Sequence, residues 1–120
     1  MTLNVSTAAV IATDEWLAWY DDLDEQADDA MTAAVDTLRV MGVGLRAPLS
    51  SAINGSRYAL RELRTQAGGR PLRTFYIFDV ERAAVLLIGG DKTGDERFHD
   101  RMIPIAERTW EQYQCERGSK

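Results

Sequence analysis

Apolar residues are concentrated in two dense runs in the second half of the chain. The first run spans residues 72–80, the second begins at residue 83, and residues 79–82 form a charged break between them. Aromatic, β-branched and leucine residues on both sides of such a break are typical of a β-hairpin. Because both runs are too apolar for strands that are wet on one face, we expect two central strands of a small sheet with at least one face covered by helices.

Helical periodicity marks the first third of the chain, after residues 1–13, which predict a short strand or an arm. Trp16, Leu17 and Tyr20 predict a short helix that begins at residue 13 or 14 and pauses near residue 21. A second amphipathic helix is predicted over residues 24–41, with a glycine stop at residue 42. This helix has an acidic outer face, which is either solvated or contacts a basic partner. The face carries Asp24, Glu25, Asp28, Asp29 and Asp36.

Breaker residues predict a loop over residues 42–56, and a strand over residues 58–64 follows. Alternation along this strand puts Glu62 and Arg64 on one face and Arg61 on the other. The last helix is predicted from residue 95 to about residue 116, and Pro104 either starts or kinks its main part. The expected fold is therefore a single α+β domain over residues 1–120. Its element order is an N-terminal strand or arm, two helices, three antiparallel strands and a C-terminal helix.

The charge of the chain is unevenly distributed, although the net value is only −5. Residues 1–45 hold nine acidic residues and one arginine, whereas residues 46–120 hold thirteen basic and ten acidic residues. This asymmetry is consistent with one face for an anion and another for a basic partner. A single cysteine, Cys115, excludes an internal disulfide. The apolar run at residues 8–12 is too short for a signal peptide or a membrane span, so we expect a cytoplasmic protein.

Two kinds of site are disfavoured by the residues themselves. The segment Gly90–Gly94 resembles a phosphate-binding loop, but it lacks the required spacing of glycines, lysine and hydroxyl residue. Asp91, Asp95 and His99 form a weak set of metal ligands. We therefore expect neither a metal nor a cofactor.

Four segments in order resemble the RelE/HigB-type toxins of bacterial type II toxin–antitoxin systems, in particular the phage-derived HigB-like branch. They are residues 60–64 with Glu-Leu-Arg, 72–79 with Arg-x-x-Tyr, 85–92 with Gly-Asp-Lys, and 103–108. The resemblance covers about residues 14–115. It implies a RelE-like fold, with a small twisted antiparallel sheet, two N-terminal helices and a C-terminal helix. It also implies a metal-independent endoribonuclease (an mRNA interferase) that cuts mRNA on the ribosome and is neutralised by a helix-turn-helix, HigA-like antitoxin.

The resemblance also assigns roles to particular residues. The implied catalytic residues are Arg64, Arg73, Lys92 and His99, and the implied RNA-binding residues are Arg61, Arg70 and Arg97. Arginine and lysine can stabilise the charge that develops when the RNA 2′-hydroxyl attacks its neighbouring phosphate. Histidine exchanges protons most readily near neutral pH, so His99 is the predicted proton-transfer group, with Glu62 or Asp91 as alternatives. Phe98 occupies the position where related toxins often carry a catalytic tyrosine, and phenylalanine cannot donate a proton.

Structural explanations stand beside these roles. Arg64 and Arg73 can pair with Glu62 and Asp79, and Lys92 and His99 can be solvated surface residues. An acidic chain is also unusual for a nuclease that docks on ribosomal RNA, because RNA binding favours basic proteins. Two other functions therefore stay open on the same fold: a ParE-like inhibitor of DNA gyrase, and a non-catalytic binding module.

Overall fold

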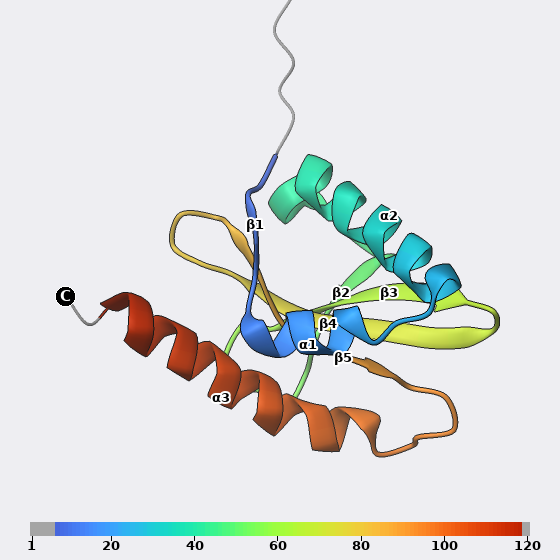
Figure 1. Ribbon diagram of the computed structural model, residues 1–120. Helices are drawn as coiled ribbons and strands as arrows, with labels where there is room; N and C mark the ends of the chain where they lie inside the picture. Colours follow the sequence, from blue (N-terminus) through green and yellow to red (C-terminus); the bar gives the residue numbers. More distant parts are fainter. Residues whose placement is uncertain (1–6, 119–120) are drawn as a thin grey trace, which may run out of the picture.

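Helices cover both faces of a five-stranded sheet (Figure 1). The computed structural model describes residues 7–118. Its strands are β1 Val10–Ala12, β2 Ser50–Ala52, β3 Arg61–Ala67, β4 Arg70–Phe78 and β5 Ala84–Asp91. Its helices are α1 Asp14–Asp21, α2 Glu25–Met41, the 3₁₀ turn η1 Gly42–Gly44, and α3 Phe98–Gly118. Within these residues, no helix has the length and apolar character needed to cross a membrane.

The sheet confirms the predicted α+β class and refines its topology. The strand order is β1-β5-β4-β3-β2, and every neighbouring pair is antiparallel except β1 and β5, which run parallel. The predicted central hairpin is β4 and β5. The sheet is therefore mixed, because the predicted N-terminal strand, β1, lies at its edge parallel to β5.

Two boundaries differ from the prediction for identifiable reasons. The strand predicted over residues 58–64 lies at Arg61–Ala67, because the turn at Gly68 and Gly69, both with positive φ, lets β3 pair with β4 as far as Ala67. The loop predicted over residues 42–56 contains β2, whose three residues pair with β3. Pro104 lies inside a helix that continues on both sides, so it starts no separate helix.

Side-chain capping explains where the first two helices begin. Thr13 Oγ1 accepts a hydrogen bond from the backbone N–H of Trp16 at 3.2 Å, and it also donates to the carbonyl of Leu86 at 2.8 Å. Asp24 caps α2 by accepting from the N–H of Ala27 at 2.9 Å. These caps satisfy orphan donors of the first helical turn. Thr13 in addition ties α1 to β5.

The sheet separates two hydrophobic cores. The core under α1 and α2 includes Trp16, Met31, Leu63, Tyr76 and Leu86. The core under α3 includes Leu60, Phe75, Leu87, Phe98 and Trp110. Because successive residues of a strand point to opposite faces, β4 and β5 contribute to both cores, whereas the apolar residues of β3, Leu63 and Ala67, lie in the core under α1 and α2. Phe98, in the first turn of α3, lies at one end of the core under α3. Beyond it, the C-terminal part of β3 and the N-terminal part of β4 carry polar side chains.

Candidate functional site

One face of β3 passes from the hydrophobic core to solvent in steps of two residues. Leu60, just before the strand, is buried in the core under α3, and Glu62 is buried as well. The side chain of Arg64 is 41% exposed, and Gln66 near the end of the strand is exposed. Alternate residues of a strand share a face, so these polar groups lie on the side of the sheet that carries α3.

Strand β4 places Arg73 directly opposite Arg64 in the antiparallel register. Arg73 shares its face with Phe75, which lies in the core under α3. Two like charges in such a cross-strand pair repel each other. An anion between the two guanidinium groups would relieve that repulsion through charge-assisted hydrogen bonds, so the pair is a candidate phosphate site.

Three side chains surround the buried carboxylate of Glu62. Two are the cations of Arg64 and Arg73, and the third is His99, which is a cation when it is protonated. Glu62 Oε2 accepts a hydrogen bond from Arg64 Nε at 3.0 Å, and Glu62 Oε1 lies 2.8 Å from His99 Nε2 and 3.9 Å from Arg73 Nε. Burial raises the pKa of Glu62, but the hydrogen bonds and charges of His99 and Arg64 outweigh burial and hold that pKa below its ordinary value. Glu62 is therefore an ionised acceptor at neutral pH. We call Glu62, Arg64, Arg73 and His99 the Glu62 cluster.

Arg73 carries a buried donor that the protein leaves unsatisfied. Its side chain is 13% exposed, and its Nε has no hydrogen-bond partner among residues 7–118. Its Nη1 donates to the carbonyl of Leu72 at 3.0 Å. Burial lowers the pKa of Arg73, the charge of Glu62 raises it and the charge of Arg64 lowers it, with a net decrease. A buried donor without a partner is costly, and the nearest carboxylate oxygen, Glu62 Oε1, lies 3.9 Å away, too far for a hydrogen bond.

The first turn of α3 brings His99 to Glu62. A Cβ added at Gly90 of β5 would lie 2.8 Å from Cε1 of Phe98, so the bare backbone at Gly90 allows this turn to approach the sheet closely. The rings of Phe75 and His99 pack with their centroids 5.6 Å apart. The side chain of His99 is 36% exposed, so part of the imidazole reaches solvent while Nε2 is held by Glu62.

Lys92 lies on the His99 side of the cluster. Its backbone N–H donates to the carbonyl of Pro71 at 2.8 Å, which joins the end of β5 to the start of β4. Lys92 and His99 line a cavity of about 520 Å³, together with Pro71, Gly94, Asp95 and Glu96. A second cavity, of about 330 Å³, is lined by Pro48, Leu49, Arg64, Thr65, Gln66 and Arg73. Residues of the Glu62 cluster thus line both cavities.

Of the three other arginines singled out in the sequence, Arg61 and Arg70 lie apart from the Glu62 cluster, and Arg97 precedes its histidine by two residues. Arg61 points to the opposite face of the sheet, where its Nε donates to Ser50 Oγ at 3.0 Å. Arg70 forms an ion pair with Asp24, the N-terminal cap of α2, at 2.9 Å. Arg97 is exposed in the loop that precedes α3, two residues before His99. The structure therefore brings Arg64, Arg73 and His99 together, puts Lys92 beside His99, and leaves Arg61 and Arg70 elsewhere.

Glu62 is the residue whose importance sequence reasoning underestimated. The sequence offered it only as an alternative proton-transfer group or as a pairing partner, whereas the structure puts it at the centre of the cluster. The signal was its place in an alternating strand between Leu60 and Arg64, on the face that must become buried. Ser51 Oγ, on β2, also donates to Glu62 Oε2 at 3.5 Å. Asp79 does not reach the arginines, since it accepts hydrogen bonds from the backbone of the β4–β5 turn.

Two other observations delimit the site. Phe98 is buried at 1% exposure, so the position expected for a tyrosine belongs to the core. Within residues 7–118, no group of three or more histidine, cysteine, aspartate or glutamate side chains is arranged to hold a metal ion. The Glu62 cluster itself offers fixed cations, one carboxylate and one imidazole.

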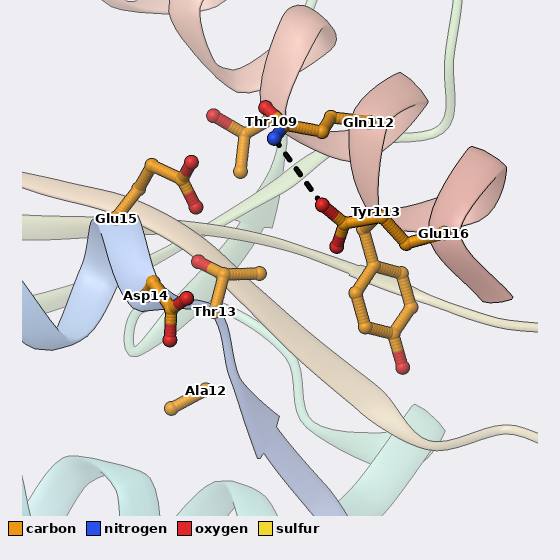
Figure 2. Close-up of a pocket in the computed structure, with 8 residues that line it drawn as sticks. All are labelled: Ala12, Thr13, Asp14, Glu15, Thr109, Gln112, Tyr113 and Glu116. Atoms are coloured by element: carbon orange, nitrogen blue, oxygen red, sulfur yellow. Dashed lines mark hydrogen bonds between the residues drawn. The ribbon is translucent and has the colours of Figure 1, made fainter.

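A third cavity, of about 210 Å³, lies between the start of α1 and the C-terminal half of α3. Figure 2 shows Asp14 and Glu15 on one side of it and Glu116 on α3 on the other. The amide of Gln112 donates to Glu116 at 3.3 Å. Because three carboxylate residues line this cavity, it disfavours a phosphate and contrasts with the Glu62 cluster.

A family model described as phage-derived protein Gp49-like matches residues 18–111. The chain belongs to the Gp49-like family.

Two curated proteins of Mycobacterium tuberculosis are similar to this Gp49-like chain. The protein named "Putative toxin HigB3" is 36% identical over 107 residues, which are 88% of this chain and 92% of that protein. The protein named "Putative toxin HigB2" is 31% identical over 99 residues, which are 80% of this chain and 49% of that protein. No solved structure matches the chain. The predicted kinship with phage-derived, HigB-like proteins is confirmed.

Proposed function

We propose that this Gp49-like protein is the toxin of a type II toxin–antitoxin system and acts in the cytoplasm as a metal-independent endoribonuclease, or mRNA interferase, on the translating ribosome. The names of its two relatives support the toxin assignment. The observation that supports the chemistry is the Glu62 cluster, in which two opposed arginines adjoin a carboxylate-bound histidine. Translation inhibition would follow from loss of mRNA.

The hydrogen bond between Glu62 and His99 defines which imidazole nitrogen can act on the substrate. An ionised carboxylate at 2.8 Å favours the tautomer with a proton on Nε2. The neutral ring then has its lone pair on Nδ1, which can take the proton of the RNA 2′-hydroxyl. Glu62 stabilises the imidazolium that forms, as a buried carboxylate does in other proton-transfer pairs. In this scheme Glu62 is a positioning residue and His99 is the catalytic base.

The cationic side chains act on the phosphate and on the leaving oxygen. As the 2′-oxygen bonds to phosphorus and the 5′-oxygen departs, negative charge grows on the phosphoryl oxygens beside Arg64 and Arg73. The guanidinium of Arg73 is held in place by the carbonyl of Leu72, so its exposed part is a preorganised donor for that charge. Lys92, in the cavity that His99 also lines, stabilises the departing 5′-oxygen. Each fixed donor of this kind contributes roughly 10²–10³ in rate.

The partners in this proposal are mRNA, the ribosome and a HigA-like helix-turn-helix antitoxin. Arg97 is exposed beside the site, so it is the best placed of the three proposed RNA-binding arginines. Arg61 and Arg70 are engaged by Ser50 and Asp24 on other surfaces, where they can meet only a different part of a large RNA. The proposed RNA contact therefore centres on the side of the sheet that carries α3.

The deciding experiment is induced expression without antitoxin, followed by mapping of new mRNA 5′ ends. We expect growth arrest with new cuts in translated messages for the wild type, and loss of both for Arg73→Ala and Lys92→Ala. Arg39→Ala, on the exposed end of α2, is the matched control and should behave as wild type. Arrest with intact mRNA and blocked replication would instead support a gyrase inhibitor. Normal growth with folded wild-type protein would support a non-catalytic binding module.

A further inference from the structure

The cavity beside Arg64 and Arg73 contains more than a phosphate site requires. Besides the two arginines, its lining includes the exposed ring of Pro48 and the side chain of Gln66, together with Leu49 and Thr65. Its volume of about 330 Å³ lies within the range of pockets that hold small organic groups. A phosphate group alone would use only the cationic part of this surface.

Backbone hydrogen bonds and strand pairing explain why this cavity lies next to the Glu62 cluster. The N–H of Arg64 donates to the carbonyl of Leu49 at 2.8 Å, which fixes the loop before β2 against the edge of β3. Gln66 follows Arg64 on the same face of β3, and its register partner on β4 is Pro71. The cavity is thus held between ordered strands, and it shares Arg64 and Arg73 with the proposed phosphate site.

We propose that this cavity is a nucleobase subsite, which holds a base next to the phosphate that is cut, and that Gln66 contacts the edge of that base. The proposal rests on the proposed nuclease function and extends it to substrate selection. A flat base has apolar faces that can pack on the ring of Pro48, while a guanidinium plane such as that of Arg64 stacks on bases in single-stranded RNA. The side-chain amide of Gln66 offers a donor beside an acceptor, which matches a base edge.

Substitution at Gln66 makes this assignment testable. Loss of the amide in Gln66→Ala removes the edge contact but leaves Arg64 and Arg73 in place. Gln66→Glu keeps the shape but presents acceptors only. Because guanine offers two neighbouring donors, N1–H and the N2 amino group, the Glu variant should favour guanine. Gln112→Ala is the matched control, since Gln112 is an exposed glutamine on α3 that lines the cavity beside Asp14 and Glu15.

The experiment compares base frequencies around all new mRNA 5′ ends in cells that express each variant. We expect a wild-type preference at one position next to the cut, a reduction of that preference by about fivefold or more in Gln66→Ala, and a shift toward guanine in Gln66→Glu. Gln112→Ala should retain the wild-type pattern. Cuts that persist in Gln66→Ala with unchanged base frequencies would overturn the subsite and leave the nuclease assignment intact.

A binding measurement covers the case in which the wild type makes no cuts, which would refute the proposed function itself. The purified protein is titrated with each of the four nucleoside monophosphates, and the side-chain amide signals of Gln66 and Gln112 are followed by ¹H–¹⁵N NMR. Selective shifts at Gln66 that differ among the four bases would support base binding in the cavity. Equal or absent shifts at the two glutamines would overturn it.

Discussion

The two ends of α3 stand beside surfaces of opposite chemistry. His99, in its first turn, contacts the buried Glu62, which also interacts with Arg64 and Arg73. Gln112 and Glu116, in the last turns of α3, face the acidic start of α1 (Figures 1 and 2). At 1.5 Å per residue, the thirteen positions from His99 to Gln112 span about 20 Å, which exceeds the Debye length of roughly 8 Å at physiological salt. The two surfaces are therefore electrostatically independent of each other in solution.

This separation explains how an acidic chain can carry an anion-binding site. The net charge of −5 describes the whole molecule, but a ligand at the Glu62 cluster meets two opposed arginines and a lysine in the adjacent cavity. The difference between the two surfaces also lies in burial. The carboxylate of Glu62 is buried and neutralised by its partners, whereas Asp14 and Glu15 are exposed. Local placement, rather than net charge, decides what each surface attracts.

The largest expected effect in this contrast comes from Arg73. Arg73→Ala should lower cleavage by about 10²–10³, because it removes a preorganised donor. Arg73→Lys should remain much nearer to the alanine variant than to wild type, because lysine keeps the charge but lacks the planar fork. Both variants should unfold at a temperature close to that of wild type, since each loses an unsatisfied buried donor. Quantified mRNA cleavage and thermal unfolding check this, and full activity in the lysine variant would show that charge alone suffices.

Glu62→Gln should have the next largest effect, and it should act on stability as well as on cleavage. The pKa of Glu62 is lowered in the folded chain, so its ionised form stabilises the fold above its ordinary value of 4.5. This contribution is lost as the pH falls below that value and the carboxylate becomes protonated. Hydrogen bonds to charged groups contribute about 1.5–3 kcal/mol, so we expect a loss of about 2 kcal/mol for Glu62→Gln at pH 7.

Urea unfolding of wild type and Glu62→Gln at pH 7 and at pH 3 measures this prediction. The difference in unfolding free energy between the two proteins should be smaller at pH 3 than at pH 7, because protonation of Glu62 removes the contribution of its charge. The cleavage rate should fall as well, because the amide stabilises an imidazolium at His99 less than the carboxylate does. A stability difference that is equal at both pH values would contradict the assignment of Glu62 as an ionised acceptor.

Gly90→Ala tests how closely α3 must approach the sheet to hold His99 at Glu62. The added Cβ would lie 2.8 Å from Phe98, and overpacking of this kind typically costs about 1–3 kcal/mol. The displacement should also weaken the contact between His99 and Glu62 and so reduce cleavage. Gly44→Ala is the control, since nothing lies within 4 Å of a Cβ at Gly44. Unchanged cleavage in Gly90→Ala would show that His99 need not be held by the first turn of α3.

The contrast also shows which parts of this molecule could be inferred from the order of residues. The central hairpin and the helix α2 carry strong local patterns, and both were predicted. Strand β2 could not be predicted, because Ser50–Ala52 has no apolar alternation. Ser50 is buried, and its hydroxyl forms hydrogen bonds with Tyr76 and Arg61 from other strands. Its formation depends on contacts that are distant along the chain.

The site could be predicted in its residue types but only partly in its geometry. Alternation along β3 already separates Arg61 from Arg64, because neighbouring residues of a strand point to opposite faces. The ion pair between Arg70 and Asp24 joins positions 46 residues apart, so no local sequence pattern predicts it. The contact between Glu62 and His99 likewise spans 37 residues and depends on where α3 begins. Long-range pairing therefore decided which of the predicted cations share a site.

The smallest expected effect is at the acidic surface, where Asp14→Asn combined with Glu15→Gln removes two charges near the cavity of Figure 2. Both residues lie in the first turn of α1, where acidic side chains stabilise the helix dipole, so stability should fall by no more than about 1 kcal/mol. Cleavage should stay within about twofold of wild type, because this surface lies well beyond the range of screened charge interactions with the Glu62 cluster. A severalfold rise in cleavage, measured at low and at high salt, would instead show that the acidic end repels the ribosome and that the two surfaces act together.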